Sequence, residues 1–388
     1  MLYPALRIAF ALSRHVSQTW RGRLGALGGD AFYWLAPAKR RNTVRNMAIV
    51  LGDGGDDGGY GGRRAKAAAR ASARNYGRYV TDFFNLPNVP LAEIVRHARV
   101  EGWEHLDRAL EAGKGVIFAG GHVGLWDYAP AVIADRYPGR IYVVAEPFTS
   151  PQVEALIQGQ RAAQGSTVIP MTNVRAMARA LKGNNIVVLL VDRPVAGDGV
   201  TVDFFGRPTT VPAGAATLAA LTGAAILPGY FRRRPDGDFE GGVLPPIVAH
   251  KTGDRAADVQ RTTQDVFAAL ERIIRRGPAH WYMFRDMWGT ALTPHPTRIG
   301  LPALAAGRQP NHADWSLGSS DPTAQPTLPD AGEGERAAVD TRSEGGRAII
   351  DSAPSRGSSP LPRTGECAGP SAAAEGPVSH GSGVRAAR

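Results

Sequence analysis

Cysteine is almost missing from this chain of 388 residues, since Cys367, near the C-terminus, is the only one. A single thiol can neither close a disulfide within the chain nor build a cysteine-ligated metal site, so both frameworks are excluded. This composition fits a protein of the reducing cytoplasm.

Long uncharged hydrophobic runs are missing as well. Residues 1–20 are apolar, but Arg7, Arg14 and His15 interrupt them. The stretch is too short and too charged to span a bilayer, and it lacks the basic, apolar and small-residue order of a signal peptide. We expect an amphipathic helix here, which either lies on a membrane or packs against the rest of the protein.

Two groups of functional motifs are also absent. No Gly-X-Ser-X-Gly sequence occurs, which argues against a hydrolase that presents its serine nucleophile on that elbow. No zinc-finger, RNA-recognition or helix-turn-helix signature occurs either, so the sequence predicts no nucleic-acid partner.

Basic residues, in contrast, are in excess. The chain has 45 basic and 35 acidic side chains, and from Leu301 onward it has eight arginines, no lysine and ten acidic residues. The first 300 residues therefore carry 37 basic and 25 acidic groups, a net charge of +12. This charge predicts an anionic partner, and an anionic membrane surface or a phosphorylated substrate fits best.

From Val100 onward, short apolar runs alternate with helical segments, which predicts an α/β fold with a central, mostly parallel sheet flanked by helices. The expected strands are residues 115–119, 141–145, 186–191 and 225–231. The expected helices include residues 151–164, 174–182, 214–222 and 254–276.

The pattern divides the chain into three parts. Residues 1–99 read as a helical, membrane-facing region, and residues 100–298 as the α/β core. Residues 299–388 are rich in proline, glycine, serine and charge without apolar periodicity, so we expect a disordered tail.

The most informative run is Phe118–Asp127, in which His122 directly follows a strand. A histidine at the end of a buried strand is held rigidly, as a general base requires. Asp127, five residues further on, could bind the far ring nitrogen and fix the tautomer. A structural histidine is the alternative, and the pair lacks the third and fourth ligands of a metal site, so no metal is predicted.

Further polar residues follow the other strands. Glu146 and Asp192 stand at strand ends, Arg161 lies on the helix after Glu146, and Arg207 belongs to an aromatic and glycine-rich segment. The carboxyl ends of parallel strands form the crevice in which ligands bind. The alternatives are a solvated helix position for Arg161, a cap or ion pair for Asp192, and a turn contact for Arg207.

These residues lie in blocks that resemble a known family. The segment Gly121–Asp127 resembles the HX4D/E motif of the lysophospholipid and glycolipid acyltransferases. More narrowly, about residues 21–288 are similar to the bacterial lipid A (lauroyl/myristoyl-type) acyltransferases and the mycobacterial phosphatidylinositol mannoside acyltransferases. The other blocks that carry the resemblance are Arg41–Asn46, Phe204–Pro208, Thr222–Ala224 and His280–Trp288.

The resemblance implies an acyl transfer from a thioester to a hydroxyl group. In that reading His122 is the general base, Asp127 orients it, and Asp192 is the acidic residue at the later strand end. Glu146, Arg161 and Arg207 would contact substrate. No cofactor is implied beyond the co-substrate, acyl-CoA or acyl carrier protein (acyl-ACP).

The resemblance also implies a location and an acceptor. We expect a peripheral or monotopic protein on the cytoplasmic face of the bacterial plasma (inner) membrane, acting on a glycolipid or lysophospholipid. Asp127 in place of glutamate favours a phosphatidylinositol mannoside-like acceptor. The alternatives are a lipid A (Kdo2-lipid IVA-type) acyltransferase that uses acyl-ACP, and a non-catalytic lipid-binding protein on the same fold.

Overall fold

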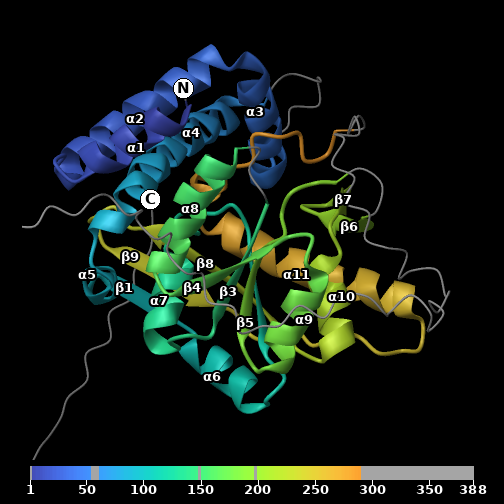
Figure 1. Ribbon diagram of the computed structural model, residues 1–388. Helices are drawn as coiled ribbons and strands as arrows, with labels where there is room; N and C mark the ends of the chain where they lie inside the picture. Colours follow the sequence, from blue (N-terminus) through green and yellow to red (C-terminus); the bar gives the residue numbers. More distant parts are fainter. Residues whose placement is uncertain (1, 54–60, 147–149, 196–198, 290–388) are drawn as a thin grey trace, which may run out of the picture. The chain divides into compact units, whose positions relative to one another are not determined.

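A computed structural model describes residues 2–53, 61–146, 150–195 and 199–289, with side chains from residue 7 onward (Figure 1). The predicted disordered tail, residues 299–388, lies outside the described residues.

A seven-stranded sheet forms the centre of the described chain, with the strand order β1-β9-β8-β2-β5-β3-β4. All neighbouring strands are parallel except β8 and β9, so the predicted mostly parallel sheet is confirmed. The strands are β1 Ala98–Glu101, β2 Val116–Gly120, β3 Ile141–Ala145, β4 Ser166–Pro170, β5 Ile186–Leu190, β8 Ala225–Arg233 and β9 Phe239–Val243.

Strand β2 lies in the middle of the sheet and is buried along its whole length. Its residue Val116 is level with Ile186 of β5 on one side and with Ala225 of β8 on the other. A strand with neighbours on both edges and helices on both faces needs apolar side chains at every position. The run before His122 has that composition, which is why the strand could be predicted.

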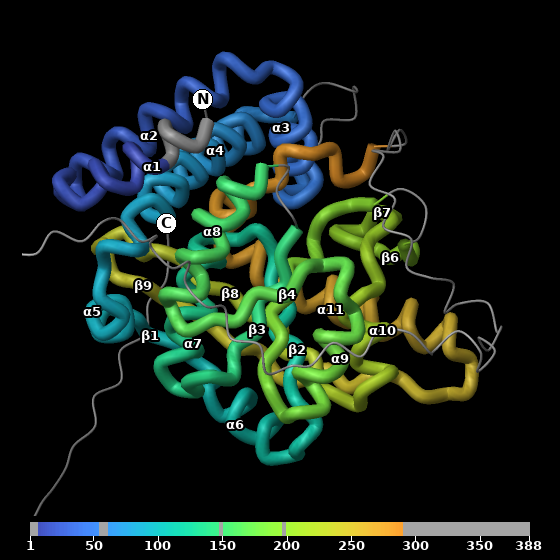
Figure 2. Tube along the Cα trace, viewed as in Figure 1, coloured from blue at the N-terminus to red at the C-terminus, as the bar shows by residue number. Residues whose placement is uncertain are grey.

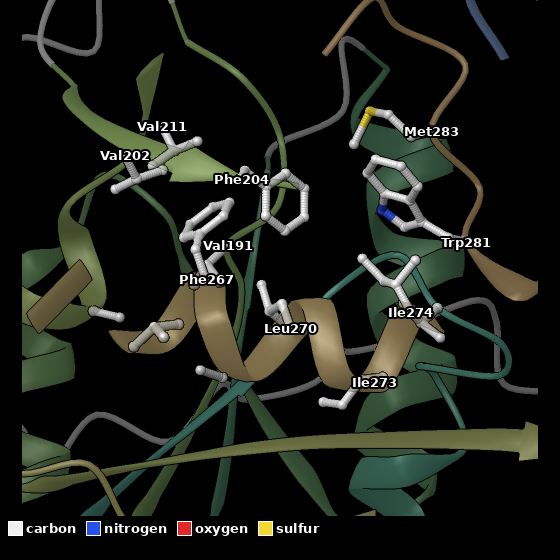
Figure 3. Close-up of a cluster of buried hydrophobic side chains, with 14 of the residues drawn as sticks. Val191, Val202, Phe204, Val211, Phe267, Leu270, Ile273, Ile274, Trp281 and Met283 are labelled. Atoms are coloured by element: carbon white, nitrogen blue, oxygen red, sulfur yellow. The ribbon is translucent and has the colours of Figure 1, made fainter. Parts of the chain in front are cut away.

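Two helical layers cover the sheet. One face is covered by α6 and α7, and the opposite face by α9, α10 and α11. In the second layer the aromatic rings of Phe204, Phe267 and Trp281 pack together over α11 (Figure 3). The helices are α6 Trp103–Glu111, α7 Ala129–Arg136, α8 Pro151–Ala163, α9 Val174–Lys182, α10 Gly214–Thr222 and α11 Arg255–Arg275.

The segment that contains Arg207 folds as a separate two-stranded hairpin, β6 Val200–Phe204 and β7 Arg207–Val211. The sequence analysis identified its aromatic and glycine content but did not predict these strands. Both turn residues, Phe205 and Gly206, have positive φ angles, 54° and 74°. A tight hairpin turn of the type I′ kind requires this conformation, which is uncommon for phenylalanine.

The N-terminal region is helical, as predicted. Its elements are α1 Leu2–Ser13, α2 Gln18–Leu35, α3 Pro37–Leu51, α4 Arg63–Asn85, the short 3-10 helix η1 Leu86–Asn88 and α5 Leu91–Arg96. None of the helices within the described ranges combines the length and the hydropathy needed to cross a membrane.

Glycines bring α2 and α4 into close contact. A Cβ atom on Gly77 would lie 1.9 Å from the carbonyl oxygen of Gly25, and one on Gly29 would lie 2.2 Å from that of Ala73. Such distances are far below van der Waals contact, so only glycine permits this approach. One side of α2 is thereby fixed against α4, and its other side faces outward (Figure 1).

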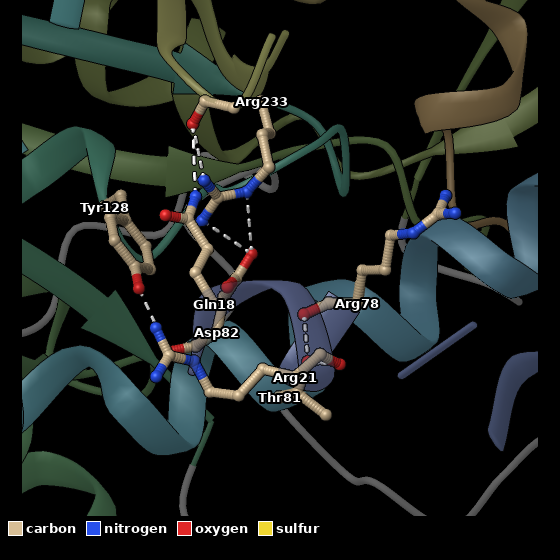
Figure 4. A network of polar contacts seen from close by, with 8 residues as sticks. Gln18, Arg21, Arg78, Thr81, Asp82, Tyr128 and Arg233 are labelled. Atoms are coloured by element: carbon tan, nitrogen blue, oxygen red, sulfur yellow. Dashed lines mark hydrogen bonds and ion pairs between the residues drawn. The ribbon is translucent and has the colours of Figure 1, made fainter. Parts of the chain in front are cut away.

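A polar network ties these helices to the sheet (Figure 4). The buried Asp82 of α4 pairs with Arg233 of β8 at 3.0 Å, and its backbone carbonyl accepts the Tyr128 hydroxyl at 2.9 Å. Burial raises the pKa of Asp82, although the charge of Arg233 opposes that effect. Arg233 also donates to the carbonyl of Gly237, which accepts Gln18 of α2 as well.

The chain after α11 returns to the N-terminal helices. The 3-10 helix η2, Pro278–His280, and the residues after it run beside α3 and α4 (orange in Figure 2). Asn46 of α3 donates to the carbonyl of Met283 at 3.0 Å, and Ser72 of α4 donates to that of Trp281 at 2.8 Å. These buried bonds fix the position of the Trp281 backbone.

Candidate active site

Three neighbouring strands end at one edge of the sheet, and each is followed by a predicted site residue. His122 follows β2, Asp192 follows β5, and Glu146 follows β3. The bond from the N–H of Val191 to the carbonyl of Gly120 continues the β2–β5 ladder to the point where both chains leave the sheet. The ends of parallel strands are the usual position of a ligand crevice.

His122 and Asp192 form a buried hydrogen-bonded pair. Nδ1 of His122 lies 2.6 Å from Oδ1 of Asp192, and the backbone N–H of His122 donates to Oδ2 at 2.8 Å. The Asp192 side chain is fully buried, whereas 13% of the His122 side chain is exposed. Burial acts to raise the pKa of Asp192, but the charge and hydrogen bonds of His122 and the indole N–H of Trp281 outweigh it, so this pKa lies below its usual value.

This arrangement assigns the two nitrogens of the His122 ring. The ionised carboxylate of Asp192 accepts the proton on Nδ1, so the neutral ring has its lone pair on Nε2. Within the described residues no group is hydrogen bonded to Nε2. The ring can therefore accept a proton from a bound hydroxyl or thiol through this nitrogen.

Two glycines in the motif make the geometry possible. A Cβ atom on Gly121 would lie 3.0 Å from Oδ2 of Asp192, so a side chain there would push the carboxylate away. Gly124 has a φ angle of +66°, and a Cβ on it would lie 2.4 Å from the carbonyl oxygen of Phe231. Position 124 therefore needs glycine for this loop conformation, and Gly121 leaves room for the Asp192 carboxylate.

Backbone hydrogen bonds hold the His122 loop on two sides. The N–H of Gly124 donates to the carbonyl of His280, and the N–H of Tyr282 donates to the carbonyl of His122, both at 2.9 Å. On the other side, the N–H of Leu125 donates to the carbonyl of Phe231 at 2.7 Å. Residues 280–282 thus form part of the site, although they lie about 160 positions further along the chain.

Asp127 forms no hydrogen bond or ion pair with the His122 ring, which corrects the expectation that it would orient the base. Its Oδ1 accepts Nε of Arg161 at 2.9 Å, and its Oδ2 accepts the Tyr79 hydroxyl at 2.5 Å. The reason is the local fold, because the residues after Gly124 turn the Asp127 side chain toward α4 and α8. The carboxylate next to the ring is Asp192.

Asp127, Arg161 and Tyr79 form a cluster that is separated from His122 by the ring of Trp126. The Tyr79 ring is 3.9 Å from that of Trp126, and the Trp126 ring is 5.2 Å from that of His122. Burial and the nearby charge of Asp127 raise the pKa of Tyr79 far above its usual value, so the phenol stays protonated and donates. Arg161 also donates to Gln158 at 3.0 Å, so its guanidinium is fixed from two directions.

Glu146 and Arg207 lie in more exposed surroundings. Glu146 pairs with Arg193 at 2.8 Å at the same sheet edge as His122, and more than half of its side chain is exposed. Arg207 is exposed on the β6–β7 hairpin, where its backbone pairs with Phe204 and its side chain forms no hydrogen bond or ion pair with another described residue. The structure thus brings Glu146 to the site edge and leaves Arg207 on a separate hairpin.

Two residues of the site were missed by sequence reasoning. Trp281 donates its indole N–H to Oδ2 of Asp192 at 2.9 Å, and Tyr79 holds Asp127. The His280–Trp288 block was noted as part of the resemblance, but nothing in its spacing linked it to Asp192. Tyr79 is a buried residue of α4, within the part of the chain for which the sequence predicted only a helical region.

Comparison with known proteins identifies the family of the chain. The family described as bacterial lipid A biosynthesis acyltransferase matches residues 5–290. A protein named phosphatidylinositol mannoside acyltransferase from Mycobacterium tuberculosis is 33% identical over 225 residues, which is 56% of this chain and 69% of that protein. One of the same name from Mycolicibacterium smegmatis is 32% identical over 273 residues, 68% of this chain and 84% of that protein. The chain therefore belongs to the bacterial lipid A biosynthesis acyltransferase family and is an acyltransferase.

Proposed function

We propose that the protein moves a fatty acyl chain from an acyl thioester to a hydroxyl group of a membrane glycolipid or lysophospholipid. The observation that carries this proposal is the His122–Asp192 pair, which leaves Nε2 of a partly exposed imidazole ready to accept a proton. An alcohol is a poor nucleophile while it is protonated, and a positioned base accelerates its attack by about 10²- to 10⁴-fold.

The reaction follows from that geometry. Nε2 of His122 takes the proton of the acceptor hydroxyl as its oxygen attacks the thioester carbonyl carbon. The ionised Asp192 stabilises the imidazolium that forms. When the tetrahedral intermediate collapses, the carbon–sulfur bond breaks and the imidazolium returns its proton to the thiolate. The products are the acylated lipid and free CoA or acyl carrier protein.

We propose Arg161 as the donor for the oxyanion. The backbone N–H groups of His122, Val123, Gly124 and Leu125 each donate to an acceptor within the protein. They are therefore occupied, whereas a guanidinium has five N–H donors and here uses only part of them on Asp127 and Gln158. We assign Asp127 the role of holding Arg161, and Glu146 that of a polar contact at the mouth of the site.

The acceptor is proposed to be phosphatidylinositol mannoside-like. Support comes from the two mycobacterial relatives of that name. The family as a whole is described by lipid A biosynthesis. A lipid A precursor with acyl-ACP as the donor is therefore the second candidate.

We further propose that the protein docks peripherally on an anionic membrane, the cytoplasmic face of the plasma membrane, through an outer face of α1 and α2. The exposed apolar side chains are Ile8 and Leu12 of α1 and Trp20, Leu24, Leu27 and Trp34 of α2, all between 52% and 65% exposed. The positions on α2 recur at helical spacing on the side opposite Gly25 and Gly29, which are packed on α4. Exposed apolar patches of this kind occur at membrane interaction sites.

The charge around the apolar face favours an anionic lipid surface over a protein partner. From Leu2 to Leu51 the chain has eight basic residues and one acidic residue, Asp30. Asp30 is paired with Arg70 and Arg74, so it does not offset the charge at the face. Basic residues beside tryptophans at a helix surface are typical of proteins that bind anionic bilayers.

The experiment that tests the reaction uses the purified full-length chain with labelled palmitoyl-CoA or palmitoyl-ACP. The acceptors are a phosphatidylinositol mannoside, a lysophospholipid and a lipid A precursor, each in mixed micelles. The variant is His122→Ala. His250→Ala is the matched control, because His250 also forms a short pair with a carboxylate, Asp265, at 2.8 Å on the surface.

We expect labelled lipid from the wild type and from His250→Ala, and none from His122→Ala. Mass spectrometry of the product then identifies the acceptor and the donor. Failure to form product from either donor would contradict the proposed reaction and favour a non-catalytic lipid-binding protein.

A further inference from the structure

The carboxylate of Asp192 has a third donor besides the two from His122. The indole N–H of Trp281 donates to Oδ2 at 2.9 Å, and the Trp281 side chain is completely buried. Oδ2 thus receives the His122 backbone N–H and the indole, while Oδ1 is left to the ring of His122. The two oxygens therefore have separate tasks.

We propose that Trp281 is a positioning residue for acyl transfer. It acts on His122 through Asp192 and lowers the proton affinity of the His122–Asp192 pair. The inference rests on the proposed function of His122. It goes beyond that function because it assigns a catalytic effect to a residue of the hydrophobic core.

The first reason is geometric. A buried carboxylate with a single partner can rotate about its side-chain torsions, and the ring it binds then moves with it. Here the indole fixes Oδ2, and the indole itself is fixed. Its backbone carbonyl accepts the Ser72 hydroxyl, and its ring packs edge-on against Phe204 at 5.9 Å.

The second reason is electrostatic. An N–H dipole aimed at a carboxylate stabilises its negative charge, and more strongly in a water-free site. That charge is least compensated when the His122 ring is neutral, because the imidazolium neutralises part of it. The indole therefore favours the unprotonated, active form of the pair, and its loss should make the pair take up a proton at higher pH.

Other charged groups near the pair are already paired. Asp127 is bonded to Arg161 and Tyr79 behind Trp126, and Glu146 is bonded to Arg193 at the sheet edge. His280, which precedes Trp281, is mostly buried, and burial followed by the charge of Arg232 lowers its pKa to about 4, so it is neutral in the working range. These groups are unchanged when the indole is replaced.

The test compares Trp281→Phe with Trp288→Phe. Both tryptophans belong to one aromatic cluster, with ring centres 6.2 Å apart, and each indole donates one hydrogen bond. Trp288 donates to the backbone carbonyl of Phe204 instead of a carboxylate. Trp281 is completely buried and Trp288 only partly, so the two variants lose different amounts of packing, and the shift of the pH profile is the readout that reports on the bond to Asp192.

We expect Trp281→Phe to lower kcat by about tenfold and to move the acid limb of the kcat/KM–pH profile to higher pH, with KM little changed. The tenfold loss in kcat corresponds to the free energy of a hydrogen bond to a charged group. Trp288→Phe should keep the wild-type profile. Equal kcat losses and unchanged profiles in the two variants would overturn the proposal.

A second replacement at position 281 removes the N–H group without a change in packing. Benzothienylalanine at position 281 keeps the shape of the double ring but has sulfur in place of the N–H group. It should reproduce the altered pH profile of Trp281→Phe, and a wild-type profile would overturn the proposal. Activity in His122→Ala would instead contradict the proposed function itself, so the two failures are distinguishable.

Discussion

The outer face of α2 and the edge of the sheet after β2 and β5 depart from the usual distribution of side chains in opposite directions. On α2, Trp20, Leu27 and Trp34 are more than half exposed. At the sheet edge, the charged Asp192 is completely buried. Exposed tryptophan and leucine lose the free energy of burial, and a buried carboxylate loses its hydration, so both arrangements need compensation.

The compensation differs between the two regions. Asp192 is stabilised within the chain by three hydrogen-bond donors. On α2, Trp20 and Trp34 contact the guanidinium groups of Arg23 and Arg40, but more than half of each side chain stays exposed, and in our proposal a lipid surface covers it. The comparison teaches that the site chemistry is completed internally, whereas the N-terminal helices need an external surface.

The largest expected effect on activity comes from a change to Asp192, whose burial is compensated within the protein. Asp192→Asn should lower kcat by about 10³- to 10⁴-fold, because the amide can favour the ring tautomer that has its proton on Nε2. Acyl transfer in detergent micelles measures the effect, and circular dichroism verifies folding. A loss of less than tenfold would show that Asp192 does not support the base.

The external compensation is tested by Trp20→Ser, Leu27→Ser and Trp34→Ser combined. We expect binding to anionic vesicles to fall by about 10²- to 10³-fold, since each side chain loses part of its burial free energy. Vesicle sedimentation at several salt concentrations measures it, and wild-type binding should weaken as salt rises. Leu221→Ser combined with Val248→Ser, two exposed positions elsewhere, is the control and should bind normally.

His280 sharpens the comparison, because it is a mostly buried group without compensation at Nδ1 among the described residues. Burial, followed by the charge of Arg232, lowers its pKa from 6.5 to about 4. Below pH 6.5 the unfolded chain binds a proton that the folded chain does not, so stability falls as the pH drops toward 4. We expect His280→Phe to remove about 2–3 kcal/mol of this loss, measured by urea unfolding at pH 7 and pH 4.

Asp127 tests whether the two carboxylates of the site have different tasks. Asp127→Asn should lower kcat/KM by about 10- to 100-fold, the scale expected for a weakened hold on a charged donor. Arg161→Lys should have a similar effect, and the double variant should lose little more, because both changes disrupt one ion pair. If the losses in kcat/KM of the two single variants add up in the double variant, Asp127 and Arg161 act independently, which would contradict this account.

The smallest effects concern two adjacent glycines of α2. Gly29→Ala should destabilise the protein by about 1–3 kcal/mol, since its Cβ would overlap the Ala73 carbonyl. Gly28 has open space around its Cβ position, so Gly28→Ala should stabilise the helix by about 0.5–1 kcal/mol. Thermal unfolding measures both, and equal signs would contradict the assigned packing of α2.

Much of the fold could be predicted because its signals are local. Strands β2, β3, β5 and β8 are short apolar runs, and helices α8, α9 and α11 begin at side-chain caps, Ser150, Asn173 and Asp254. The hairpin β6–β7 was missed because Phe205 in a left-handed turn is contrary to its usual preference. Strand β9, Phe239–Val243, contains two glycines and has little apolar pattern to identify it.

For the candidate site, the sequence identified the residues but not their pairing. His122 and Asp127 are close in sequence, so local spacing suggested that they interact. The pairing is decided by the sheet order, which sets β5 beside β2 and so brings Asp192 to the ring. The contribution of Trp281 depends on the return of the chain to α3 and α4, which no local pattern reveals.

The most direct test of the account measures acyl transfer to one acceptor in two forms, dissolved in detergent micelles and embedded in anionic vesicles. Asp192→Asn should lose transfer in both forms while it still binds vesicles. The triple serine variant of α2 should keep transfer in micelles and lose it on vesicles. Normal transfer by Asp192→Asn, or equal losses of the triple variant in both forms, would contradict the division of tasks between the two regions.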